Sequence, residues 1–221
     1  MLSSTLRMLA LFFAPIAVSG YLCGCLNGAI LVSHLFCKDD VRRYGSGNAG
    51  LTNFYRTYGG KYALMVIAVD MGKAFLSVAL AQLWYRNGIV PLLGGEANGV
   101  LPVLLNYVAG FFCMLGHMFP AFSGFHGGKG ILCSAALLLA LDWRVAVVSW
   151  GLFFLVAALT RYVSLGSLAA AWVFPFTTHL IYRDTAVTAV AVLLMLFITF
   201  AHRQNIVRLC HGTENKFHRK K

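Results

Sequence analysis

Long apolar stretches separated by short polar segments dominate this chain. A hydrocarbon core about 30 Å thick needs roughly 20 apolar residues in a helix, or fewer where neighbouring helices shield a segment. The pattern therefore predicts an all-α integral membrane protein, and the ~10-residue alternating segments of a membrane β-barrel are absent. The predicted spans are residues 8–37, 61–86, 98–118, 131–141, 143–160, 165–182 and 186–203.

The number of spans depends on the polar break at Asp142-Trp143-Arg144, which divides an otherwise continuous apolar run. Without the break there are six spans and both termini lie on one side; with it there are seven. Seven spans gather most Lys and Arg residues on one side, which the positive-inside rule makes cytoplasmic. That side holds residues 38–61, 117–130, 159–165 and the tail from residue 203. We expect one membrane domain, residues 1–221, with a periplasmic N-terminus and a cytoplasmic C-terminus.

Composition agrees with this prediction, since 59% of the residues are hydrophobic and only 11% are charged. An ordinary soluble domain has about 25% charged residues, so disorder is excluded and a soluble enzyme is disfavoured. The net charge of +11 would indicate nucleic acid in a soluble protein, but here it indicates a cytoplasmic face near membrane lipids or an anionic substrate. The six cysteines lack zinc spacing and are interpreted as packing residues.

Within the first span, Gly20, Gly24 and Gly28 recur every four residues. Such spacing lets helix backbones approach closely, so we expect a packing role. In the second span, Asp70 and Lys73 are ionisable residues at membrane depth, where charge is costly. Their i, i+3 spacing predicts an ion pair near the active cavity, with direct substrate contact as the alternative.

Two glycine-rich polar stretches lie on the predicted cytoplasmic side. The first, GSGNAGLTNFYR over residues 45–56, resembles a dinucleotide fingerprint, but no strand precedes it and no βαβ pattern surrounds it. Its glycines can still turn backbone N–H groups toward an anion, and Arg56 can bind phosphate bidentately. The second, GHMFPAFSGFHGGKG over residues 116–130, ends at a helix start beside Lys129, a further anion-binding arrangement. For the first, a solvated loop is the alternative.

A third polar group combines TRYVSLGS, residues 160–167, with HRQNIVRLCHGTE, residues 202–214. His202, Asn205 and Arg208 share one face if the last helix continues beyond the membrane. The basic residues Lys216 to Lys221 are interpreted as a membrane-surface anchor. His117 and His126 have no third ligand nearby, so no metal is expected.

These motifs resemble those of the bacterial membrane glycerol-3-phosphate acyltransferases that use acyl phosphate as donor. They occur in family order and include an Asp-x-x-Lys pair, here Asp70 and Lys73. Ala49 and Leu51 stand where the family often has Pro and Ala, and Ala74 replaces a common Gly. These changes flank the polar groups and affect loop rigidity rather than chemistry.

The resemblance implies a seven-span inner-membrane enzyme of phospholipid synthesis that uses no cofactor. It would acylate the C1 hydroxyl of glycerol 3-phosphate and release phosphate. The implied contacts to the phosphorylated substrates are Ser46, Arg56, Lys129, Ser167, His202 and Asn205, with Ser164 as the alternative to Ser167. Asn48, Thr52, Gly127 and Gly128 would shape the loop for the donor phosphate.

Two questions stay open at this point. The proton of the attacking hydroxyl goes either to His202, whose ordinary pKa is around 6.5, or to the substrate's own phosphate. A transporter of a phosphorylated metabolite would also explain the basic face and the buried charges. Secondary transporters usually have repeated halves with broken helices, however, and no internal repeat is visible.

Overall fold

The computed structural model describes residues 2–95 and 99–216, and over that part of the chain every regular element is helical, with no β-strand. By its internal contacts the chain divides into two units, Met1–Leu141 and Asp142–Lys221. The boundary falls at the predicted break, because one helix ends at Leu141 and the next begins at Trp143. Division of the long apolar run at Asp142 is therefore confirmed.

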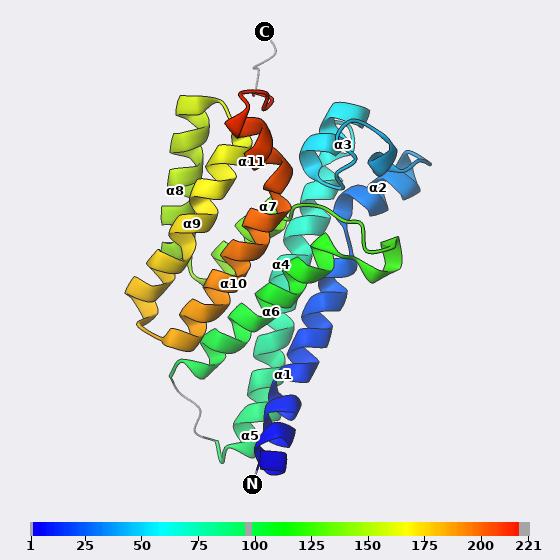
Figure 1. Ribbon diagram of the computed structural model, residues 1–221. Helices are drawn as coiled ribbons and strands as arrows, with labels where there is room; N and C mark the ends of the chain where they lie inside the picture. Colours follow the sequence, from blue (N-terminus) through cyan, green and yellow to red (C-terminus); the bar gives the residue numbers. More distant parts are fainter. Residues whose placement is uncertain (1, 96–98, 217–221) are drawn as a thin grey trace. The chain divides into compact units, whose positions relative to one another are not determined.

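The first unit is built around α1, α4 and α6, which pack against one another, and α7 packs mainly against α4 (Figure 1). Its helices are α1 (Leu2–Cys25), α2 (Gly28–Phe36), α3 (Leu51–Tyr58), α4 (Ala63–Trp84), α5 (Val90–Leu92), α6 (Leu101–Met118) and α7 (Ile131–Leu141). Two 3-10 turns, Val41–Arg43 and Ala121–Ser123, and a π-helical turn, Tyr85–Ile89, complete it.

Glycines allow α1 and α6 to approach closely, as the repeat in the first span predicts. A Cβ atom at Gly24 would overlap the carbonyl oxygen of Cys113, and one at Gly116 would overlap that of Tyr21. Gly28 faces α4 instead, where a Cβ would lie 2.7 Å from the carbonyl oxygen of Val66. The packing interpretation of the glycine repeat is confirmed, and larger residues would push these helices apart.

The second unit consists of α8 (Trp143–Thr160), α9 (Val163–Tyr182), α10 (Thr185–Ala201) and α11 (Arg203–Cys210). α9 packs against both α8 and α10. Asp142 caps the start of α8 by accepting from Arg144 N (2.8 Å), and it also accepts from the hydroxyl of Tyr182 at the end of α9 (2.6 Å). Large apolar side chains such as Leu159 remain exposed, as surface in contact with lipid requires.

Two of the predicted spans are bent rather than continuous. The first divides into α1 and α2, which meet at 42° across residues 26–27, and the last divides into α10 and α11, which meet at 60° at His202. The tail therefore continues as a separate helix, α11, at an angle to α10 rather than as its straight extension. At the first bend, Asn27 is a single polar residue in an apolar run, which gives no sign of a break.

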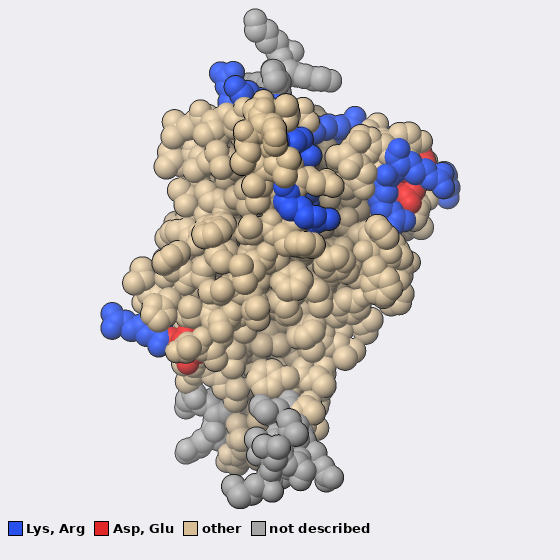
Figure 2. Space-filling model, in the orientation of Figure 1, with Lys and Arg blue, Asp and Glu red and all other residues tan. Residues whose placement is uncertain are grey.

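Among the described residues, four helices are long and apolar enough to cross a membrane, or up to six when each bent pair counts as one span. The predicted span over residues 131–141 forms α7 with those same bounds, but it has only eleven residues. Seven spans and the orientation of the termini stay predictions. Figure 2 shows Lys and Arg of the first unit gathered over α2 and α3. The surface of the helices directly below them is drawn without charged residues in that view.

Candidate functional site

The first glycine loop joins the turn Val41–Arg43 to α3, and the buried side chain of Asn53 shapes it. Asn53 Nδ2 donates to the carbonyl oxygens of Val41 (3.1 Å) and Tyr44 (3.0 Å), while its Oδ1 accepts from Ser46 N (3.1 Å). Gly45 and Gly47 have φ values of 58° and 68°, which favour glycine. One side chain on α3 therefore fixes a loop whose conformation the sequence pattern alone leaves open.

The second glycine loop connects α6 to α7 and folds back onto the end of α6. Gly127 N donates to the carbonyl oxygen of Met118 and Gly128 N to that of His117, both at 3.1 Å. Gly130, with φ of 75°, accepts from Ser134 N (2.7 Å) and so precedes the first turn of α7. This arrangement places Lys129 immediately before a helix N-terminus, where the helix dipole favours an anion.

The two glycine loops touch each other. A Cβ atom at Gly128 would overlap the carbonyl oxygen of Ala49, so only glycine allows this approach. Arg42 adds a second link, because its Nη1 donates to the carbonyl oxygens of Ser123 (2.7 Å) and His126 (3.1 Å). Both loops with predicted phosphate contacts thus form one surface of the first unit.

Buried beneath these loops, Asp70 and Lys73 form the predicted ion pair, with 2.8 Å between Oδ1 and Nζ. His117 joins them, with Nδ1 2.7 Å from Lys73 Nζ and 3.6 Å from Asp70 Oδ1. The ring that the sequence offered as a candidate metal ligand therefore faces an ammonium. His126 is exposed and lies apart from this cluster, with Nδ1 2.6 Å from the carbonyl oxygen of Gly124.

In the second unit, the third motif and the tail meet at Glu214. Its carboxylate accepts from Ser164 Oγ (2.8 Å), Asn205 Nδ2 (2.8 Å) and Arg208 Nε (2.7 Å). Asn205 and Arg208 thus share a face, as predicted, whereas His202 lies at the bend with Nδ1 2.8 Å from the carbonyl oxygen of Ile198. A carbonyl can only accept, so Nδ1 of His202 carries a hydrogen.

Ser164 and Ser167 differ in their partners. The hydroxyl of Ser167 donates back to the carbonyl oxygen of Val163 in its own helix (2.9 Å), and Ser164 reaches the tail. Of the two serines, Ser164 is therefore the one that joins the third motif to the tail, through Glu214.

Glu214 also gives the second unit a pH-dependent link. Burial alone would raise the pKa of Glu214, but hydrogen bonds from Asn205, Arg208 and Ser164 outweigh it and lower the pKa below its ordinary value. The stability from this carboxylate is therefore present above the ordinary glutamate pKa of about 4.3 and is lost as the pH falls through the lowered value.

We expect Glu214→Gln to lower the free energy of unfolding at pH 7 by about 1–3 kcal/mol, the usual range for a hydrogen-bonded charge. The difference from the wild type should begin to shrink as the pH falls below about 4, where the unfolded wild-type chain becomes protonated at this position, and should vanish below the lowered pKa of the folded protein. Thermal unfolding of the two proteins between pH 7 and pH 3.5 measures this. An equal difference at every pH would contradict the assignment.

The sequence-predicted site residues divide between the units. The first holds Ser46, Asn48, Thr52, Arg56, Gly127, Gly128 and Lys129, and the second holds Ser167, His202 and Asn205. Within the first unit the contact at Gly128 brings the predicted donor loops together, and the side chains of Ser46, Thr52 and Arg56 are exposed. Sequence reasoning missed the loop-shaping roles of Asn53 and Arg42, and also Glu214, although all lie in or beside the quoted motifs.

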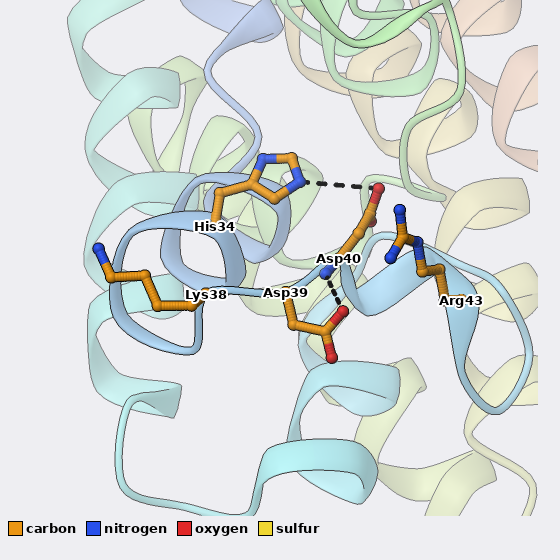
Figure 3. Close-up of a pocket in the computed structure, with 5 residues that line it drawn as sticks. All are labelled: His34, Lys38, Asp39, Asp40 and Arg43. Carbon is orange, nitrogen blue, oxygen red and sulfur yellow. Dashed lines mark hydrogen bonds and ion pairs between the residues drawn. The ribbon is translucent and has the colours of Figure 1, made fainter.

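A separate open hollow of about 350 Å³ lies at the end of α2 and is not part of this site (Figure 3). Its lining residues are His34, Lys38, Asp39, Asp40 and Arg43. Arg42 pairs with Asp40 (2.8 Å) and, against the effect of burial, lowers its pKa to about 2, while Asp39 accepts from the hydroxyl of Tyr44 (2.7 Å). Both acids already have partners, and no predicted site residue lines the hollow.

Comparison with known proteins gives one consistent family. A family model described as glycerol-3-phosphate acyltransferase matches residues 14–212. A glycerol-3-phosphate acyltransferase of Fusobacterium nucleatum is 34% identical over 206 residues, covering 93% of this chain and 98% of its own. The glycerol-3-phosphate acyltransferase of Ralstonia nicotianae is 37% identical over 206 residues, covering 93% of this chain and 94% of its own.

Solved structures agree with these relatives. The chain is similar to the glycerol 3-phosphate form of PlsY (YgiH), an integral membrane glycerol 3-phosphate acyltransferase, with a TM-score of 0.76 and 30% identity. That match covers 92% of this chain and 94% of the other. The lysophosphatidic acid form of the same protein gives a TM-score of 0.74 with 28% identity.

Proposed function

Because the chain belongs to the glycerol-3-phosphate acyltransferase family, we propose that it transfers a fatty acyl group from acyl phosphate to the C1 hydroxyl of glycerol 3-phosphate. The products are 1-acyl-glycerol 3-phosphate and inorganic phosphate. The observation that carries this proposal is the contact between the two glycine loops, where Gly128 lies against the carbonyl oxygen of Ala49. Two glycine-rich backbones joined beside Lys129 make a site suited to a phosphate group.

The donor phosphate binds at these joined loops. Gly127 and Gly128 shape the loop that precedes α7, and Lys129 adds the full positive charge of its ammonium beside the N-terminus of that helix. The first loop contributes short polar side chains from Ser46, Asn48 and Thr52. The acyl chain extends into the bilayer, since its apolar length favours lipid over water.

The acceptor is a second anion and needs its own donors. We assign Arg56, Ser167, His202 and Asn205 to the phosphorylated substrates, with Arg56 as the fork that holds a phosphate bidentately. Glu214 accepts from Asn205 and so fixes the orientation of its amide. Two anions brought to one reaction centre repel each other, which explains the need for several basic groups there.

In the transfer step, the C1 oxygen of glycerol 3-phosphate attacks the acyl carbonyl carbon. A carbon–oxygen ester bond forms, the bond between the acyl carbon and the phosphate oxygen breaks, and phosphate leaves with its electron pair. Backbone N–H groups or the Ser46 hydroxyl stabilise the negative charge that develops on the carbonyl oxygen. The hydroxyl proton goes to His202 or to a substrate phosphate, and the reaction balances without a cofactor or metal.

This activity places the protein in the bacterial inner membrane as a multi-pass, single-domain enzyme of phospholipid synthesis. The family and the apolar helices support a membrane location. We infer seven spans, because α7 with eleven residues can cross only where neighbouring helices shield it, and α4 and α6 pack against it. The basic loops then lie on the cytoplasmic side with the phosphorylated substrates.

Labelled glycerol 3-phosphate with purified protein in sealed lipid vesicles separates this function from transport. With acyl phosphate added, we expect the label to become extractable into organic solvent as lysophosphatidate. Water-soluble label trapped inside the vesicles, with none in the organic phase, would refute the acyltransferase and support transport of a phosphorylated metabolite.

A further inference from the structure

The break between α1 and α2 leaves backbone groups that a continuous helix would pair. At membrane depth such groups need other partners, because lipid offers none. Lys73 Nζ donates to the carbonyl oxygens of Gly24 (3.2 Å) and Leu26 (3.0 Å), and Asp70 Oδ1 accepts from Gly28 N (3.0 Å). The cation thus lies at the C-terminal end of α1 and the anion at the N-terminal end of α2, as the helix dipoles favour.

His117 connects this ion pair to the site. The ammonium of Lys73 can only donate, so Nδ1 of His117, 2.7 Å away, accepts, and the neutral ring carries its hydrogen on Nε2. Nε2 points at the second glycine loop, since a Cβ at Gly128 would overlap it. Asp70, Lys73 and His117, the buried triad, therefore extend from the helix break to the backbone that we assign to the donor phosphate.

A second path joins the same break to the same loop. Asn27, in the break itself, donates from Nδ2 to the carbonyl oxygen of Ala49 (3.1 Å), while its Oδ1 caps α2 by accepting from Ile30 N (3.1 Å). The Ala49 carbonyl is also the group against which Gly128 packs. These contacts form a closed ring within the first unit. It runs from the helix break to the first loop, on to the second loop, and back to the break through the buried triad.

We infer that the buried triad and Asn27 are positioning residues that set the spacing of the two glycine loops and so the affinity for the acyl phosphate donor. None of them has to touch the substrate. Their effect is specific, because the ring of contacts fixes the donor loops and leaves the assigned contacts of the third motif and tail unchanged. This inference rests on the proposed function.

The test uses the full-length protein in lipid, with KM measured separately for palmitoyl phosphate and for glycerol 3-phosphate. In His117→Asn, the amide oxygen can still accept from Lys73 near the position of Nδ1. The substitution removes the part of the imidazole that reaches Gly128. We expect KM for palmitoyl phosphate to rise about tenfold, because the second loop loses its packing against the imidazole, and KM for glycerol 3-phosphate to change less than about twofold. His117→Gln, whose longer amide can reach the Nε2 position, should recover part of this loss.

Asn27→Ser provides a second variant that leaves the ion pair intact. Serine can still cap α2 but cannot reach Ala49, so the donor KM should again rise selectively. The matched control is His126→Asn, the same substitution at an exposed side chain of the second loop, which should behave like the wild type.

Unchanged donor KM in both His117→Asn and Asn27→Ser would overturn the inference, as would KM values for the two substrates that rise together. A wild-type protein with no turnover of palmitoyl phosphate refutes the proposed function instead. The two failures are therefore distinguishable.

Discussion

We expect Lys129→Ala to lower kcat/KM for acyl transfer by about 10²–10³, the cost typical of removing one preorganised group that stabilises developing charge. The reason is the position of Lys129 between Gly128, packed on the first loop, and the N-terminus of α7. Its ammonium is the full positive charge that we place beside the departing phosphate. Initial rates with palmitoyl phosphate and glycerol 3-phosphate measure the effect.

Lys61→Ala is the matched control, since Lys61 is an exposed lysine of the same unit with no assigned substrate contact, and its Nζ lies 5.0 Å from the ring centroid of Tyr62. It should retain the wild-type rate. Both variants should elute as folded protein and unfold at temperatures near that of the wild type. Lys129→Ala with a rate within about twofold of the wild type would refute the site assignment.

Lys73→Met is expected to have the largest effect on stability. It leaves the Asp70 carboxylate buried without its partner, and it removes the donor to the carbonyl oxygens of Gly24 and Leu26. Breaking one side of a buried ion pair costs about 3–5 kcal/mol. Unfolding of the purified protein in detergent, followed by near-UV circular dichroism, measures the loss.

The double variant Asp70→Asn with Lys73→Met tests whether the loss comes from the unpaired charge. Removing both charges should restore part of the stability that Lys73→Met loses, because no uncompensated ion remains. If the double variant loses as much free energy of unfolding as the two single variants together, the two residues act independently, and this result would contradict the ion pair.

The sequence predicted the long helices well, because each of them follows from an apolar run with a polar boundary, whereas the short polar helices α3 and α11 were not predicted. α7 and α8 have the predicted bounds, and Asp142 caps α8 as a polar residue between two apolar runs should. The bends at residues 26–27 and at His202 were not predictable. The first depends on Asp70 and Lys73, which supply partners for the backbone from another helix and so remove the usual penalty for a break.

For the site, local spacing predicted what lies on one helix. Asp70 and Lys73 are one helical turn apart, and the sequence alone indicates their pairing. His117 is 44 residues from Lys73, and Glu214 is 50 residues from Ser164, so these contacts exist only because the fold brings distant segments together. The glycine motifs predict where a phosphate binds, but they give no sign that the two loops touch.

The most direct measurement of the central claim compares donors. Purified protein in lipid receives labelled glycerol 3-phosphate with either palmitoyl phosphate or palmitoyl-CoA, and lysophosphatidate and released phosphate are quantified. We predict lysophosphatidate from palmitoyl phosphate alone, with one phosphate released per product. Product from palmitoyl-CoA alone would contradict the assignment of the two glycine loops to a donor phosphate.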